Sequence, residues 1–178
     1  MKKLFAVLAA LPALASAHDV RHQGPHVHGQ AQIQIGVDDR VIDVRLNAPG
    51  MGILAFERPP ATEAETAALK KAVRVLESGN WIAFPASAGC SLKAHKVTTE
   101  GFSTAISSHD VGHVGHHHAG FEAALQFQCK STSTLDHLQL SLGRHFPGLH
   151  ETVVETATAH GQDRVELRGA QQRVELAR

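Results

Sequence analysis

The chain has 178 residues, of which 43% are hydrophobic, and it carries 17 basic and 17 acidic side chains. This length and apolar content predict one globular domain with a core. The balanced charge argues against a nucleic-acid partner.

The first 17 residues are typical of a secretory signal peptide. Two lysines precede an apolar run over residues 4–14, and an A-x-A cleavage motif follows at residues 15–17. The run is too short to span a membrane, no later stretch reaches that length, and no cysteine follows the run to carry a lipid anchor. We predict an exported chain of residues 18–178. Removal of Lys2 and Lys3 with the signal peptide leaves 15 basic and 17 acidic residues, a net charge of −2.

A first histidine group precedes the first predicted strand. The H-x-H-G motif at residues 26–29 leads into residues 30–37, where apolar and polar residues alternate as in a half-buried strand. Alternation resumes over residues 42–46 after a short turn, which predicts an antiparallel hairpin. If the first strand begins early, His26 and His28 lie on one face, a spacing that suits two ligands of one ion. They could equally be solvated strand-edge residues, and the sequence leaves both interpretations open.

One main helix is predicted between Thr62 and Gly79. Thr62 and Glu65 form a capping box after two prolines, and Gly79 is expected to end the helix. Apolar residues recur at helical spacing on one face, at Leu69, Ala72, Val73 and Leu76. We expect this face to be core rather than a site.

Cys90 and Cys129 are the two cysteines, and in an exported chain we expect them to form a disulfide. Closing a loop of about 40 residues is worth roughly 4 kcal/mol in the chain-entropy model. Oxidised cysteines are not thiolate ligands, which argues against a cysteine-rich zinc finger. Two free thiols that join a metal site are the alternative, which an exported location disfavours. We expect the bridge to anchor both ends of the histidine-rich loop between the cysteines while leaving the middle of the loop free.

Residues 107–120, between the two cysteines, are rich in histidine and glycine. Three glycines break any helix there, so we predict a loop. A histidine-rich tract indicates metal binding, and imidazole suits zinc, copper, nickel and iron better than calcium or magnesium. The alternative is a solvated loop without a ligand, but five imidazoles within ten positions favour a metal. The candidate ligands are His109, Asp110, His113, His116, His117 and His118.

The remainder of the chain has mainly strand-like patterns. The predicted strands cover residues 91–99, 121–129, 135–142, 151–159, 165–167 and 174–176. The fold class is therefore α+β: a mostly antiparallel, sandwich-like β-structure with one main α-helix and a disulfide-anchored histidine-rich loop. Five scattered histidines are expected to be ordinary surface or hydrogen-bonded residues: His95, His137, His145, His150 and His160.

Signatures of enzymes are incomplete. His150-Glu151 begins like the H-E-x-x-H zinc-protease motif, but Val154 stands where its second histidine is required. The chain has no G-x-S-x-G nucleophile elbow and no P-loop. His18, at the mature N-terminus, could chelate copper through its amine and ring, but we favour the view that signal cleavage happened to leave a histidine there. We therefore expect no enzymatic activity.

Several motifs, in their order along the chain, resemble the ZrgA-type family. They are H-x-H-G at residues 26–29, F-E-R-x-P-x-T-x-x-E at 56–65, A-x-C at 88–90, the histidine-rich insert at 109–118, Cys129 and F-P-G-L at 146–149. That family comprises periplasmic, zinc-regulated proteins of Gram-negative bacteria. The resemblance implies zinc as the bound metal and a periplasmic component of an ATP-driven zinc importer as partner. Arg58 stands where the family often carries histidine, which puts a metal role at that position in doubt.

These observations predict a periplasmic zinc-binding protein that captures or buffers zinc and delivers it to a zinc uptake system. Glycine-spaced histidines are adaptable ligands that suit capture and release, whereas a catalytic zinc needs a rigid site with an oriented outer shell. Two alternatives stay open. One is a copper- or zinc-dependent extracytoplasmic enzyme that uses His18 or the pair of His26 and His28. The other is a structural domain whose histidines respond to pH without metal.

Overall fold

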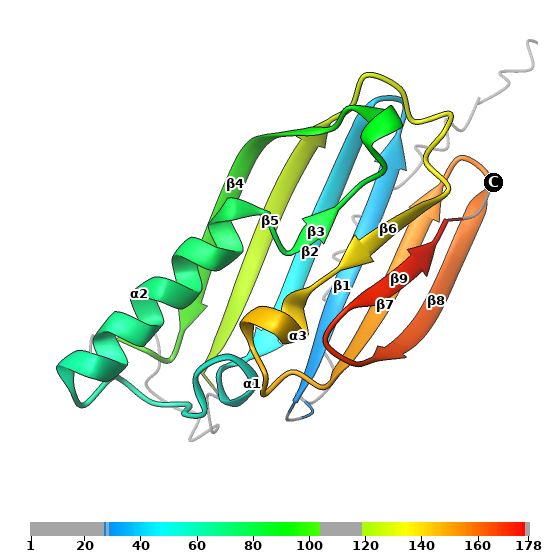
Figure 1. The fold of residues 1–178 in the computed structure, drawn as a ribbon. Helices are drawn as coiled ribbons and strands as arrows, with labels where there is room; N and C mark the ends of the chain where they lie inside the picture. Colours follow the sequence, from blue (N-terminus) through cyan, green and yellow to red (C-terminus); the bar gives the residue numbers. More distant parts are fainter. Residues whose placement is uncertain (1–26, 28, 104–118, 177–178) are drawn as a thin grey trace, which may run out of the picture.

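The computed structural model describes Val27, residues 29–103 and residues 119–176. The described residues form a larger sheet of six strands, in the order β4-β5-β2-β1-β7-β8, and a smaller sheet of three strands, in the order β3-β6-β9. Both sheets contribute side chains to one hydrophobic core. The predicted α+β class, with mostly β-structure in two facing sheets, is confirmed (Figure 1).

The centre of the larger sheet is the predicted hairpin of β1 (Gln30–Asp38) and β2 (Val41–Pro49). Its apolar residues face the core in register, as in the pair of Ile35 and Val44. Both side chains are at most 2% exposed, because alternate residues of a strand point to the same face. The alternation of apolar and polar residues therefore predicts this hairpin correctly.

On one side of the hairpin, β5 (Gly120–Gln128) pairs antiparallel with β2 and with β4 (Ser91–Glu100). Its apolar side chains alternate with polar ones and are buried, Phe121 to 1% exposure. Strand β4 forms the edge of the sheet and is mostly exposed. The connection between β4 and β5 contains most of the predicted metal ligands.

On the other side, β7 (Glu151–Thr158) pairs with β1 in parallel, and β8 (Gly161–Arg168) pairs antiparallel with β7. The parallel register places Gln30 beside Glu151, and the amide Nε2 of Gln30 donates to the Glu151 carboxylate at 2.6 Å. Arg168 donates to the same carboxylate at 2.8 Å. One carboxylate thus connects three neighbouring strands at the start of β1.

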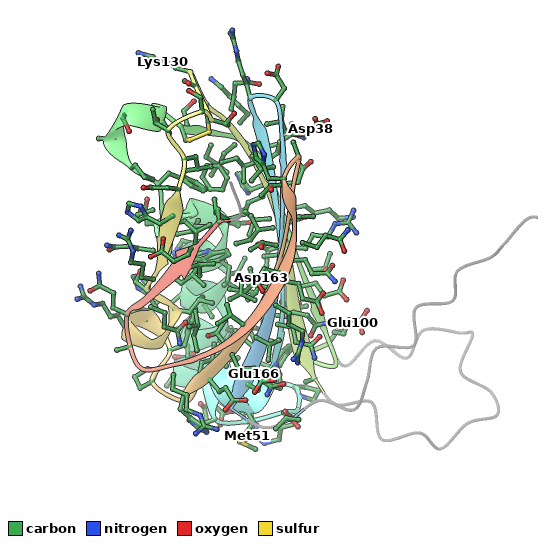
Figure 2. The ribbon with its side chains drawn as sticks, turned by 90° about the vertical axis from the view of Figure 1, so that its right-hand side faces the viewer. Asp38, Met51, Glu100, Lys130, Asp163 and Glu166 are labelled. Carbon is green, nitrogen blue, oxygen red and sulfur yellow. A yellow bond between two sulfur atoms is a disulfide. The ribbon has the colours of Figure 1, made fainter. Side chains whose placement is uncertain are left out.

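Helix α2 (Glu63–Ser78) and the smaller sheet cover the same face of the larger sheet, as Figure 1 shows. The smaller sheet consists of β3 (Ile82–Ala83), β6 (His137–Leu140) and β9 (Gln172–Glu175). Trp81 connects the two covering elements: its side chain is fully buried, and its Nε1 donates to the carbonyl of Leu76 at 3.0 Å. The opposite face of the larger sheet is polar, and among the described residues no element covers it (Figure 2).

Helix α2 begins and ends where the sequence predicts. The Thr62 hydroxyl accepts a hydrogen bond from the backbone N–H of Glu65 at 3.1 Å, which caps the first turn. Gly79 has a φ of 66° and ends the helix in the left-handed conformation that glycine adopts readily. Ala72 and Leu76 are buried in the core, so the predicted apolar face is confirmed.

Three short helical segments are not predicted by the sequence pattern: α1 (Gly50–Leu54), η1 (Ala86–Ala88) and α3 (Leu142–His145). Each is too short for apolar residues to repeat at helical spacing. The predicted strand over residues 135–142 is consequently too long at both ends, because β6 covers four residues and α3 begins at Leu142. None of the helices in the described part of the chain is long and apolar enough to cross a membrane.

Candidate metal-binding site

The predicted ligands lie outside the residues that the structure describes. They are His26, His28, His109, Asp110, His113, His116, His117 and His118. Within the described ranges, no group of three or more histidine, cysteine, aspartate or glutamate side chains is arranged to hold a metal ion. The described residues that flank the two histidine groups mark where the candidate site begins and ends in the chain.

The flanks of both groups lie at the same end of the larger sheet. Strand β1 begins at Gln30, directly after Gly29, while β5 begins at Gly120, which pairs with Glu100 at the end of β4. Because β1 is antiparallel to β2 and β2 to β5, the start of β1 and the start of β5 lie at one end. We call this the Gly29 end; Figure 2 shows Glu100 there and Asp38 at the opposite end.

Packing fixes both flanks of residues 104–118. On one flank, Phe102 is 6% exposed and its ring centroid lies 5.1 Å from that of Phe121. On the other flank, Ala119 is 1% exposed, and its carbonyl accepts a hydrogen bond from the N–H of Gly50 at 2.7 Å. The segment that carries five of the histidines is thus attached to the core at each end.

Helix α1 connects this flank to the F-P-G-L motif at residues 146–149. A Cβ atom at Gly52 would lie 2.4 Å from the side chain of Leu149, and a Cβ atom at Gly148 would lie 2.6 Å from the carbonyl oxygen of Gly52. The two segments can approach this closely only because both positions are glycine. Helix α1 and the F-P-G-L motif, which are far apart in the sequence, therefore meet at the Gly29 end, where Figure 2 shows Met51 of α1.

The H-x-H-G motif does not continue β1. The N–H of Gln30 donates to the carbonyl of Val27 at 3.1 Å, and Gly29 has a φ of 77°. This left-handed conformation is open to glycine and is not that of an extended strand. Strand β1 therefore begins at Gln30, directly after the motif, and the predicted pairing of His26 and His28 on one face lies outside the described residues.

One histidine that the sequence marks as ordinary, His150, lies at the Gly29 end. Its backbone N–H donates to the carbonyl of Gly29 at 3.0 Å, and its ring lies against the same glycine. The sequence gives no direct signal for this neighbourhood, because β1 and β7 pair across about 120 residues of chain. The F-P-G-L motif that ends at Leu149 is the nearest indication.

Other described histidines fit the ordinary roles that we expect of them. His95 is exposed on the edge strand β4, and His160 is exposed in the turn between β7 and β8. Nδ1 of His137 lies 2.5 Å from the carboxylate of Asp136. Neither the sequence nor the geometry of these three histidines indicates a metal ligand.

Cys90 and Cys129 form the predicted disulfide. The bridge lies at the end of the sheet opposite to Gly29, where the N–H of Cys129 donates to the carbonyl of Arg40 in the β1–β2 turn at 2.8 Å. At about 3.4 Å per residue, the length of β5 puts roughly 30 Å between the bridge and the Gly29 end. The disulfide therefore closes the far end of the β4–β5 hairpin, and the strand ladder, rather than the bridge itself, holds the flanks of residues 104–118.

Arg58, the position where the resembling family often has histidine, has a structural role. Its guanidinium donates to both carboxylate oxygens of Glu65, at 2.7 and 2.9 Å, and lies 5.2 Å from the ring centroid of Phe56. The hydrogen bonds from Arg58 and from the N–H of Ala61 lower the pKa of Glu65 to about 2. A guanidinium has no acceptor to offer a metal, so Arg58 stabilises the start of α2 and is not a ligand.

A shallow hollow on the uncovered face of the larger sheet is a second candidate. Polar and charged side chains line it, among them Gln32, Arg45, Lys96, Glu122 and Glu155. Its described lining includes carboxylates and cations but neither histidine nor cysteine. The hollow does not match the imidazole chemistry of the predicted site, and the Gly29 end remains the candidate.

The comparison with family models identifies the family of the chain. Residues 25–176 match the family model described as ZrgA family zinc uptake protein. The match begins just before the H-x-H-G motif and includes the histidine-rich segment, both cysteines and the F-P-G-L motif. No curated protein matches the chain.

Proposed function

Because the chain belongs to the ZrgA family of zinc uptake proteins, we propose that it captures zinc through its histidine groups and delivers it to a zinc uptake system. The observation that supports this proposal is that the flanks of both groups, Gly29 and Ala119, lie at the same end of the larger sheet. The predicted ligands are therefore tethered to one region of the surface.

The spacing of the strands supports a transfer between the two groups. Strands β1 and β5 are separated by β2 alone, and two strand spacings amount to about 10 Å. Residues 104–118 are attached to the sheet at both ends. No residue of this segment can therefore lie farther from its attachment points than about half of the extended length of the segment, about 25 Å. Zinc held by one group can thus be passed to the other without leaving the Gly29 end.

The chemistry of the ligands supports capture and release rather than catalysis. The two cysteines are joined in a disulfide, so the ligands for zinc are imidazoles and the Asp110 carboxylate. Ligands in a glycine-rich segment must be ordered when the metal binds, and this entropy cost lowers affinity and favours exchange. A catalytic zinc instead needs an oriented outer shell and an open coordination position.

We further propose that the protein works in the periplasm. Residues 1–17 would direct export and be removed, leaving residues 18–178 as one zinc-binding domain with the histidine-rich loop at residues 107–120. The disulfide fits an oxidising compartment. The partner would be the periplasmic component of an ATP-driven zinc importer.

Metal exchange tests this function. Mature protein loaded with zinc is mixed with an excess of a coloured chelator, and the transfer of zinc is followed together with the hydrolysis of ester and phosphate substrates. We expect transfer to finish within seconds and no turnover above that of zinc alone. Zinc that is retained for hours, or a zinc-dependent turnover that disappears in His26→Ala or His28→Ala but persists in His160→Ala, would favour an enzyme instead.

A further inference from the structure

Strand β8 is an open edge of the larger sheet. It pairs with β7 on one side, and no strand in the described part of the chain pairs with its other side. The backbone N–H of Arg164 donates to the side chain of Asp163 at 2.8 Å, so Arg164 directs its backbone polar groups away from β7, to the open side. Because these groups alternate in direction along an antiparallel strand, those of Glu166 point to the open side as well.

The two edge strands of this sheet differ in how well they are protected against pairing. Natural proteins protect exposed edges with lysines, prolines and β-bulges. The opposite edge strand, β4, carries Lys93 and Lys96, and its register with β5 is irregular between Leu92 and Ala94. Strand β8 has eight residues in unbroken register with β7 and contains neither lysine nor proline. It is therefore the edge that is open to a further strand.

The sequence of β8 is complementary to itself. In an antiparallel pair of two β8 strands centred on Val165, Arg164 of each copy lies directly opposite Glu166 of the other copy. Opposite charges in this position stabilise a strand pair, and like charges destabilise it. A pair centred on Arg164 or on Glu166 would instead place two like charges opposite each other. The charges therefore favour the centre at Val165.

The smaller sheet repeats this arrangement on the same side of the molecule. The residues R-V-E-L occur at 164–167 and again at 173–176, and the second copy lies mainly in β9, an edge strand of the smaller sheet. Strands β8 and β9 contact each other, as Figure 1 shows. In β9, Arg173 and Glu175 are exposed while Val174 is buried. A two-fold axis through this side can therefore bring both edges toward their own copies.

The core is incompletely covered along β8. Val165 and Leu167 pack against the core but are only half-buried. Val154, which is the partner of Val165 on β7, is fully buried. Pairing of two β8 strands would place Val165 against Val165 of the other copy and would remove apolar surface from water, which favours association.

We infer that two copies of this chain associate through β8, in a two-fold dimer that joins their larger sheets. The addition of a strand to an open edge is a general mode of recognition, and a two-fold contact uses the same residues of both copies. The Asp163 side chain competes for the N–H of Arg164, so the dimer depends on concentration. Because the joined strands are antiparallel, the Gly29 ends of the two copies point in opposite directions and stay open. The inference therefore does not rest on the proposed function.

Sedimentation equilibrium of the mature chain over a range of concentrations tests this dimer, with EDTA present to remove zinc that could bridge histidines. Arg164→Glu and Glu166→Arg should each weaken dimerisation at least about tenfold, because two attractive pairs become two repulsive ones. The side chains of Arg164 and Glu166 are 57% and 54% exposed, so both variants should fold, which circular dichroism checks. Lys96→Glu, an exposed change on the other edge strand, is the matched control and should change dimerisation less than twofold.

An equimolar mixture of Arg164→Glu and Glu166→Arg separates pairing in this register from a general effect of charge. The two variants are complementary to each other, so the mixture should form a heterodimer within about threefold of the affinity of the unaltered chain. Asp163→Ala should strengthen association, because the N–H of Arg164 loses its internal partner. A chain that stays monomeric up to about 1 mM, a dimer that forms only with zinc, or a mixture that does not associate would overturn the inference and leave the proposed function standing.

Discussion

The Nε2 atom of His150 lies where the side chain of residue 29 would project: a Cβ atom at Gly29 would be 2.1 Å from it. Position 29 therefore needs glycine for two reasons, the contact with the ring and the φ of 77°. The contact couples the H-x-H-G motif to the segment before β7. It brings together two parts of the chain that the sequence separates by about 120 residues.

Gly29→Ala tests this coupling. A left-handed φ at a residue with a Cβ atom costs roughly 1–2 kcal/mol, and the clash with the His150 ring adds to that cost. We expect the free energy of unfolding to fall by about 1–3 kcal/mol in urea titrations. In a protein that already carries His150→Ala, Gly29→Ala should lower the free energy of unfolding by at least about 0.5 kcal/mol less, because the clash with the ring is gone and only the cost of the left-handed φ remains. Equal costs in both backgrounds would show that the ring turns away freely.

Removal of the disulfide should affect stability but not zinc capacity. Replacement of Cys90 and Cys129 by alanine removes a cross-link that closes about 40 residues, so we expect a loss of about 4 kcal/mol in the free energy of unfolding, within the usual 2–5 kcal/mol. The bridge is at the end of the sheet opposite to Gly29, so the amount of zinc bound per folded chain should not change.

Thiol titration of the unreduced, unfolded protein should find almost no free thiol; two thiols per chain would contradict the pairing.

The ion pair of Arg58 and Glu65 predicts a pH-dependent contribution to stability. The pKa of Glu65 is about 2 in the folded chain against an ordinary 4.5, so the pair stabilises the fold above about pH 4.5 and loses this effect as the pH falls toward 2. Arg58→Met should lower the melting temperature near neutral pH, and the difference from the wild type should vanish near pH 2. Arg74→Met, an exposed change on the same helix, is the control. Zinc binding should be unchanged in Arg58→Met; a loss of zinc would contradict the structural role of Arg58.

Local patterns predict the elements whose apolar residues repeat. The alternation that includes Ile35 and Val44 predicts the β1–β2 hairpin, and the spacing of Ala72 and Leu76 predicts the buried face of α2. Helix α1, of five residues, is too short for such a repeat. Its position depends instead on close backbone contacts at Gly50 and Gly52, which no local pattern reveals.

The candidate site depends on pairings that only the tertiary structure provides. The sequence predicts the histidine groups as ligands, but the parallel pairing of β1 with β7 has no local signal, and it is this pairing that brings His150 to Gly29. The disulfide pairing follows from the cysteine count, whereas its distance from residues 104–118 follows from the length of β4 and β5.

We propose that the histidine-rich segment binds most of the zinc. Because protons compete with zinc for imidazole nitrogens, the pH dependence of zinc binding tests this proposal. Neutral imidazole is the ligand, and its ordinary pKa is near 6.5. Between pH 7.5 and pH 5.5, protonation should therefore weaken zinc binding about tenfold for each histidine that coordinates, or about a thousandfold for three. The flanks of the segment are packed independently, by Phe102 and Ala119, so deletion of residues 107–118 should leave the fold intact.

Calorimetric zinc titration of the mature chain and of the chain without residues 107–118, each at pH 7.5 and pH 5.5, is the most direct measurement. Circular dichroism confirms that both chains are folded. We predict that the deletion removes most of the bound zinc at pH 7.5 and that the full mature chain binds far more weakly at pH 5.5. Unchanged stoichiometry after the deletion, or an affinity that does not respond to pH, would contradict capture of zinc by this segment.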